Sequence, residues 1–354
     1  MPEKYGYYAI VMTFVGAIFG AGFVSGQELL QFYASYGLYC AFGLILMVLL
    51  YILLSYMTMA LSYDKKIKSY EEVIVGKNEK AKIICNVTIN IILFFVVIIM
   101  FAGAGSLLNN FFGINKAIGS ITLALLVMII CLSGANKIVD VFKFIVPTMV
   151  ILTIVSSLLG IINGNELLTF SNIEGVKQPT PFWFTSTLLA VSYIFIVQIS
   201  ILSPIGRQAK DKKNILIGSI LGSLAIGIVA TLICFALLKN ANVIVGVDMP
   251  MMIISNNVSS ILGLIYLVVL AIGIFTSCLA MMFALINRFA QSKIATERNK
   301  KIGVIVVCLI ALGLSLAGFS NLISIVYPIV GYIGFLANGG VIYQFIKNKA
   351  QKTT

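Results

Sequence analysis

The stretch GAIFGAGFVSGQE, residues 16–28, lies where the first apolar segment of the chain would otherwise form an uninterrupted membrane helix. It contains four glycines, and Gln27 and Glu28 follow the last of them. A glycine in a helix costs about 1 kcal/mol relative to alanine, and Gly20 and Gly22 are only two residues apart. We therefore predict an unwound segment whose bare main-chain amides and carbonyls line a protein-enclosed, hydrated cavity, because lipid does not tolerate such groups.

The glycines of this stretch and its carboxylate, Glu28, each have a simpler alternative explanation. Small residues also allow two helices to pack closely. A packing surface needs no carboxylate, however, and Glu28 is the only acidic residue well inside a predicted span. A charge at a helix centre costs about 2.5 to 3.5 kcal/mol, which half-helix amides, a substrate ammonium group or water must offset. Alternatively, Glu28 lies shallow, caps the first turn of the outer half-helix and stays hydrated.

The composition of the chain requires a membrane as its solvent. Of 354 residues, 60% are hydrophobic and 10% are charged, which is too few to cover a water-soluble surface. Runs of about 20 apolar residues are long enough to cross the hydrocarbon core as helices. They predict ten spans, at about 7–36, 38–62, 82–108, 117–133, 138–162, 182–204, 214–238, 257–286, 302–318 and 322–346.

The basic residues predict the orientation of these spans, because short cytoplasmic loops retain Lys and Arg. With the N-terminus inside, the basic residues fall in the predicted inner segments with three exceptions, namely Lys116, Lys177 and Lys239. We therefore expect a multi-pass protein of the cytoplasmic membrane with both termini in the cytoplasm. The net charge of +12 then reflects topology and contact with anionic lipids. No aromatic-interleaved basic patch indicates a nucleic-acid partner.

Catalytic chemistry finds little support in the chain. It has no histidine, which excludes triads that contain His and common zinc sites. It also lacks the GxSxG, HExxH and phosphate-cradling GxxxxGK[ST] motifs. We predict that the protein is not an enzyme and carries no organic cofactor.

The spans repeat in order, with an offset of about 175 residues between corresponding members. Because five helices are an odd number, the second set enters the membrane from the opposite side, as in the inverted repeats of secondary transporters. We predict an all-α fold of ten transmembrane helices in which the first and sixth helices are discontinuous. The first repeat is residues 1–163, the extracellular connector is 164–181, and the second repeat with its cytoplasmic tail is 182–354.

This arrangement resembles the LeuT-type fold of the amino acid, polyamine and organocation superfamily over essentially the whole chain. The motif GAGFVSGQE, residues 20–28, is similar to that of the YkvI-like membrane proteins of bacteria. The resemblance implies a sodium site formed by two carbonyls at the end of the first inner half-helix, together with a carbonyl and two hydroxyls on the eighth helix. Matched onto this chain, the sodium ligands are Gly16, Phe19, Gly273, Thr276 and Ser277.

The spacing of this ligand set is physically reasonable. Residues 273, 276 and 277 share one helix face, and all five offer neutral oxygens. A Thr-Ser pair in a membrane helix also forms local bonds to the i−4 carbonyl. Phe23 stands where carriers with a second sodium ion have an amide, so we expect one ion. Proton-coupled relatives place a lysine of the fifth helix in the sodium position, which leaves Lys143 as an alternative.

The sixth span contains no glycine before Gly206, and its polar residues are the remaining candidates for the cavity. Tyr193 could instead be an ordinary packing aromatic. Amide ends at the break suit a substrate carboxylate, and Glu28 or Tyr193 suits an ammonium group. The predicted substrate-binding residues are Gly20, Ala21, Gly22, Phe23, Glu28, Ser192, Tyr193 and Gln198.

These features predict a sodium symporter that moves a small solute, an amino acid or related amine, by alternating access. A proton-coupled carrier of the same fold remains an alternative, as do a channel or lipid scramblase and a membrane sensor that transports nothing. The expected partners are the substrate and membrane lipids. The expected assembly is a monomer or a weak homodimer.

Overall fold

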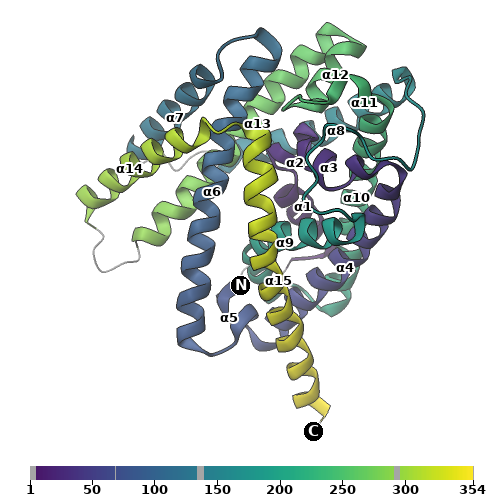
Figure 1. The fold of residues 1–354 in the computed structure, drawn as a ribbon. Coiled ribbons are helices and arrows are strands. Elements are labelled where there is room, and N and C mark those ends of the chain that lie inside the picture. Colours follow the sequence, from purple (N-terminus) through teal and green to yellow (C-terminus); the bar gives the residue numbers. More distant parts are fainter. Residues whose placement is uncertain (1–4, 68, 134–138, 291–295, 354) are drawn as a thin grey trace.

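The computed structural model describes residues 5–67, 69–133, 139–290 and 296–353, which fold into helices joined by short loops (Figure 1). The elements are α1 (Tyr7–Ile18), α2 (Ala21–Ser25), α3 (Gln27–Phe32), the 3-10 helix η1 (Ala34–Tyr39), α4 (Cys40–Lys65), α5 (Tyr70–Val75), α6 (Glu79–Phe112), α7 (Lys116–Ser133), α8 (Val139–Asn163), α9 (Trp183–Arg207), α10 (Lys212–Lys239), α11 (Ala241–Ile244), α12 (Pro250–Val258), α13 (Ser260–Ala290), α14 (Glu297–Ser315) and α15 (Phe319–Thr353).

The long helices pack in two groups. In the first, α4 packs on α9 and α10, and α1 packs on α10 and α9. In the second, α6 packs on α7, α13 and α14, and α7 lies beside α14 (Figure 1). Helix α15 runs along α9 and also contacts α6, while α8 contacts α10 and α13. The broken first segment therefore lies among helices from both halves of the chain.

Several of these helices are suited to a bilayer. Within the part of the chain that the structure describes, seven helices are long and apolar enough to cross a membrane by length and composition. Tyr7–Ile18 and Pro147–Asn163 are shorter apolar helices. Large apolar side chains such as Leu336, Ile162 and Ile261 are more than 70% exposed, which fits a surface that faces lipid. The chain is a membrane protein built from helices.

The first apolar segment is interrupted, as predicted. Helix α1 ends at Ile18, the ψ angle of Phe19 is 64°, and Gly20 has an extended backbone. The Gly20 amide donates to the Ile18 carbonyl at 2.6 Å, and not to Gly16 as a continuous helix requires. A second interruption follows at Gly26, whose φ of 81° separates α2 from α3.

The predicted break in the sixth helix is wrong. Helix α9 is continuous over Trp183–Arg207, and Pro204 lies inside its last turns. The segment has no glycine before Gly206, so no residue lowers the cost of leaving the helical ladder. The two halves of the chain are therefore unlike at this position, and only the first presents an unwound segment in the structure.

Short elements between the long helices were not predicted from the sequence. Helix α5 follows α4, and α11 and α12 follow α10. Polar side chains mark the starts of long helices: Asn78 caps α6, and Asp211 caps α10 by accepting from the Asn214 amide at 2.7 Å. The backbone and side-chain hydrogen bonds from Asn214 hold the pKa of the Asp211 carboxyl below its usual value.

The backbone at Gly26 provides a test of this fold. Gly26→Ala places a β-carbon in a left-handed conformation, and that carbon would lie 2.7 Å from Met251 Cγ. The strain should lower the free energy of unfolding by about 1 to 2 kcal/mol, measured by thermal unfolding in detergent. Gly303→Ala, within helix α14, adds a carbon that meets nothing within 4 Å; it is the control and should lose no stability, because alanine is favoured over glycine inside a helix. Equal stability of the two variants would contradict the left-handed turn.

Candidate functional site

A cavity of about 110 Å³ lies beside the interruption of the first segment. It is lined from five helices, among them α1 and α9 of the first group and α6 of the second. The lining residues are Ala17 and Ile18 of α1, Glu28 of α3, Ile92, Phe95, Val96 and Ile99 of α6, Tyr193, Ile194, Val197 and Gln198 of α9, and Val326, Tyr327 and Val330 of α15. The cavity is mostly apolar with a few convergent polar groups, which is typical of small-ligand sites.

Glu28 is the one ionisable carboxylate among these lining residues. It lies in the first turn of α3 and is only 8% exposed, so the hydrated alternative does not describe it. The Tyr193 hydroxyl donates to Glu28 Oε2 at 2.6 Å. Tyr193 in turn stacks on Tyr327, with ring centroids 4.4 Å apart. Two aromatic side chains from different helices therefore hold the carboxylate at the cavity wall.

Gly22 explains how the carboxylate fits against the break. A β-carbon added to Gly22 would lie 1.8 Å from Glu28 Oε1 and 2.7 Å from Glu28 Cδ. The main chain of α2 can therefore meet the carboxylate only because this residue has no side chain. One carboxylate oxygen rests on Gly22, and the other accepts from Tyr193.

Of the other predicted substrate-binding residues, some line the cavity and others do not. Gln198 lines the cavity beside Glu28 and Tyr193, whereas Ser192 is absent from the lining. The Ser192 hydroxyl instead accepts from Asn338 of α15 at 3.3 Å. Phe23 is buried against Phe19, with ring centroids 5.1 Å apart.

Two of the predicted residues border the break through their backbone. Gly20 is the residue that precedes α2, and Ala21 is its first residue. The side chain of Ala21 lies outside the described residues.

Of the proposed sodium ligands, Gly16 and Phe19 lie at the end of α1, and Gly273, Thr276 and Ser277 lie on α13. Since the Gly20 amide donates to Ile18, the Gly16 carbonyl is released from its helical partner. Thr276 is 2% exposed, and its hydroxyl donates to the carbonyls of Ile272 (2.9 Å) and Gly273 (3.1 Å).

These bonds of Thr276 are of the local type that we gave as the alternative to ion binding, in which a hydroxyl in a membrane helix donates to a carbonyl of the preceding turn. They use its hydroxyl hydrogen and leave oxygen lone pairs available. Ser277 is half-buried. The end of the Met149 side chain covers Gly273, where an added β-carbon would lie 2.6 Å from Met149 Cε. Lys143, the alternative to sodium, lies within α8, but its side chain is outside the described residues.

Tyr327 and the apolar face of α6 are site residues that the sequence analysis missed. Tyr327 precedes Pro328 within a long apolar helix, so the pair of an aromatic hydroxyl and a helix-disturbing proline was an available signal. Ile92, Phe95 and Ile99 had none, because they are apolar residues in an apolar span. Their place at the cavity depends on how α6 packs.

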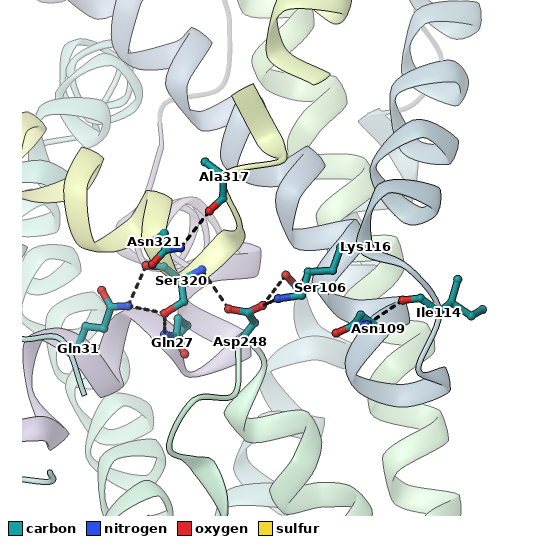
Figure 2. Close-up of polar contacts among 10 residues, drawn as sticks. All are labelled: Gln27, Gln31, Ser106, Asn109, Ile114, Lys116, Asp248, Ala317, Ser320 and Asn321. Atoms are coloured by element: carbon teal, nitrogen blue, oxygen red, sulfur yellow. Dashed lines mark hydrogen bonds and ion pairs between the residues drawn. The ribbon is translucent and has the colours of Figure 1, made fainter. Parts of the chain in front are cut away.

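A second polar centre surrounds Asp248, in the segment between α11 and α12 (Figure 2). Asp248 is 6% exposed, pairs with Lys116 at the start of α7, and accepts from the Ser106 hydroxyl at 2.8 Å. Its other oxygen accepts from the Ser320 amide at 3.2 Å. Asp248 lies outside the predicted spans, so its role was not predicted from the sequence.

The Asp248 centre is connected to the helix that carries Glu28. The Ser320 hydroxyl accepts from the Gln27 amide nitrogen at 2.7 Å and from that of Gln31 at 3.1 Å (Figure 2). These bonds join α3 to the beginning of α15, which also contributes Tyr327 to the cavity. Any movement of α3 relative to α15 must therefore break or rearrange this polar centre.

Among the described residues, no group of three or more His, Cys, Asp or Glu side chains could hold a metal ion. The carboxylates Glu28 and Asp248 occupy separate sites. One faces the apolar cavity and the other is paired with a lysine.

Tyr193→Phe tests the hydrogen bond to Glu28. The variant keeps the ring but removes a buried donor to a carboxylate, which should lower the free energy of unfolding by about 1.5 to 3 kcal/mol. Tyr332→Phe is the matched control, because Tyr332 is 60% exposed. Thermal unfolding of the two purified variants measures the difference. If both variants unfold at the same temperature as the wild-type protein, the hydrogen bond from Tyr193 to Glu28 does not stabilise the fold.

Comparison with known proteins identifies relatives of the whole chain. No established protein-family profile matches it. The "Uncharacterized membrane protein YkvI" of Bacillus subtilis (strain 168) is 26% identical over 338 residues, which are 94% of each chain. The "Uncharacterized protein YyaD" of the same strain is 21% identical over 327 residues, covering 91% of this chain and 92% of the relative.

Solved structures of known transporters share the fold. The inward facing conformation of Mhp1 matches 97% of this chain and 77% of its own, with a TM-score of 0.66 and 14% identity. MhsT in complex with L-phenylalanine matches 94% of this chain and 88% of its own, with a TM-score of 0.59 and 11% identity. The manganese transporter of Eremococcus coleocola matches 96% of this chain and 76% of its own, with a TM-score of 0.54 and 12% identity. The chain is thus a membrane protein that is similar to YkvI along nearly its whole length and has the LeuT-type fold.

Proposed function

We propose that this protein is a secondary transporter that carries a small solute, an amino acid or related amine, by alternating access and couples it to sodium. The observation that carries the proposal is the interrupted first segment with a half-open cavity beside it that contains a buried carboxylate. Discontinuous helices of this kind form the substrate sites of many transporters. The similarity of the fold to Mhp1, MhsT and a manganese transporter supports the same class of function.

The proposed topology has ten spans in two inverted repeats, residues 1–163 and 182–354, joined by 164–181. In this scheme α1 to α3 together form the first span and α8 forms the fifth. Short helices support the repeat, since α5 lies between the second and third long helices of the first half, and α11 and α12 occupy the matching place in the second. Figure 1 shows α5 and the pair α11 and α12 toward opposite ends of the molecule, as inversion requires.

The proposed location is the cytoplasmic membrane, with both termini inside. Contacts between charged residues support this orientation. At one end, Asp64 accepts from Lys212 at 2.9 Å and from Asn348 at 3.2 Å, which joins three segments predicted to be cytoplasmic. At the other, Lys116 pairs with Asp248 and Lys177 donates to Asn321, and these lysines are two of the three predicted to be outside.

The proposed sodium site combines the carbonyls of Gly16, Phe19 and Gly273 with the hydroxyls of Thr276 and Ser277. The ladder ends at Phe19 and releases the Gly16 carbonyl, which supports the α1 half of this set. Sodium entry would drive uptake, because a monovalent cation that moves inward gains roughly 2.3 kcal/mol per 100 mV of membrane potential.

Counterflow in proteoliposomes tests whether the protein is a carrier. Vesicles are loaded with one unlabelled amino acid or amine, and the entry of its labelled form is followed. A carrier accumulates label transiently above equilibrium, since exchange needs one alternating site. A channel or scramblase gives equilibration without overshoot, and a sensor gives no entry. Either of these two results would remove the transporter assignment.

Sodium coupling is tested by the double variant Thr276→Ala and Ser277→Ala. Loss of both hydroxyls should abolish the stabilisation of the purified protein by sodium chloride over potassium chloride, and with it sodium-stimulated uptake. Thr231→Ala is the control, because Thr231 makes the same type of local bond, to the Gly227 carbonyl at 2.7 Å, on α10. A sodium response that survives in the double variant would refute this ion site.

A further inference from the structure

The place at the helix break that a substrate carboxylate would need is filled by the protein itself. Glu28 Oε1 lies so close to Gly22 that a β-carbon there would be 1.8 Å away. Glu28 Oε2 accepts from the Tyr193 hydroxyl at 2.6 Å. Both oxygens thus have fixed neighbours in α2 and α9, and the carboxylate occupies the wall between the break and the cavity.

The rest of the cavity provides no partner for a second carboxylate. Among the described residues its lining contains no lysine or arginine, and beyond Glu28 its polar side chains are Tyr193, Gln198 and Tyr327. A substrate carboxylate would therefore lie near Glu28 without a compensating basic side chain from this lining, in surroundings that screen repulsion poorly. An amino acid zwitterion is a poor match for this lining.

Groups that receive a hydrogen-bond donor are present instead. Gln198 is 1% exposed, and its Oε1 atom has no hydrogen-bond partner within the described part of the chain. A buried acceptor without a donor is costly, and a ligand N–H group would satisfy it. Phe95, Tyr193 and Tyr327 add aromatic rings, which attract ammonium groups. Carboxylate, amide oxygen and rings together form a lining suited to a cation.

We propose that the substrate is a small organic amine that binds as an ammonium ion and carries no carboxylate. This inference rests on the proposed transporter function and specifies its substrate class. Glu28 is the counter-ion, Tyr193 positions it, and Gln198 accepts a hydrogen bond from the ammonium group. The cavity of about 110 Å³ is smaller than an engineered cavity of roughly 150 Å³ that holds benzene, so the hydrocarbon part has only a few carbons.

Matched pairs of ligands that differ only by a carboxylate test this inference. The pairs are ethylamine with alanine, isobutylamine with valine, and isoamylamine with leucine. Isothermal titration of the full-length protein in detergent, in sodium buffer, gives the dissociation constants. At least one amine should bind about ten-fold or more tightly than its amino acid. Tighter binding of the amino acid in every pair overturns the inference.

Glu28→Gln tests the counter-ion directly. The amide keeps the shape of the side chain and an oxygen that accepts from Tyr193, so the fold should be retained, as thermal unfolding checks. Amine affinity should fall about ten-fold or more. Glu174→Gln, at an exposed loop position, is the control and should bind as the wild type does. Unchanged amine affinity in the folded Glu28→Gln protein contradicts the role of Glu28.

Counterflow with the same ligands separates this inference from the transporter function. Overshoot with amino acids and not with amines overturns the substrate class and leaves the carrier intact. Amine binding that depends on Glu28, without counterflow, supports the substrate class and removes the carrier. Neither binding nor counterflow across the panel overturns both.

Discussion

The structure depends on a break in the main-chain hydrogen bonds of the first segment, at Phe19 and Gly20. Groups released from a helix at membrane depth must be enclosed by protein or by water. The packing of α6, α9 and α15 around this point provides the enclosure and leaves a cavity of about 110 Å³. The packing of these three long helices is therefore linked to the local break at Phe19 and Gly20.

The same break makes room for a buried carboxylate. Glu28 can approach α2 only because Gly22 lacks a side chain, and Tyr193 supplies the hydrogen bond that partly offsets its burial. Gln27 and Gln31, on either side of Glu28, join α3 to Ser320 and through it to Asp248 (Figure 2). Changes at the cavity and changes at the polar centre thus act on one short helix, which gives a physical route for coupling binding to movement.

Much of the architecture could be predicted from the sequence, because apolar length and glycine placement are local signals. The interruption near Gly20 and the burial of Glu28 followed from such signals. The sixth helix was predicted by symmetry with the first, and that prediction was wrong because the segment lacks the glycines that lower the cost of a break. The role of Asp248 and the cavity positions of Ile92 and Ile99 depend on tertiary packing between distant segments, which one sequence does not reveal.

Amide hydrogen exchange across the first segment measures the central claim most directly. The Gly20 amide lacks its regular helical partner, so a peptide covering residues 20–23 should exchange about ten-fold or more faster than residues 226–234 of the continuous helix α10. Isobutylamine should slow exchange at the break and leave α10, which contributes none of the described lining residues, unchanged. Equal protection of the two segments, with no effect of the amine, would contradict both the interruption and the ligand cavity beside it.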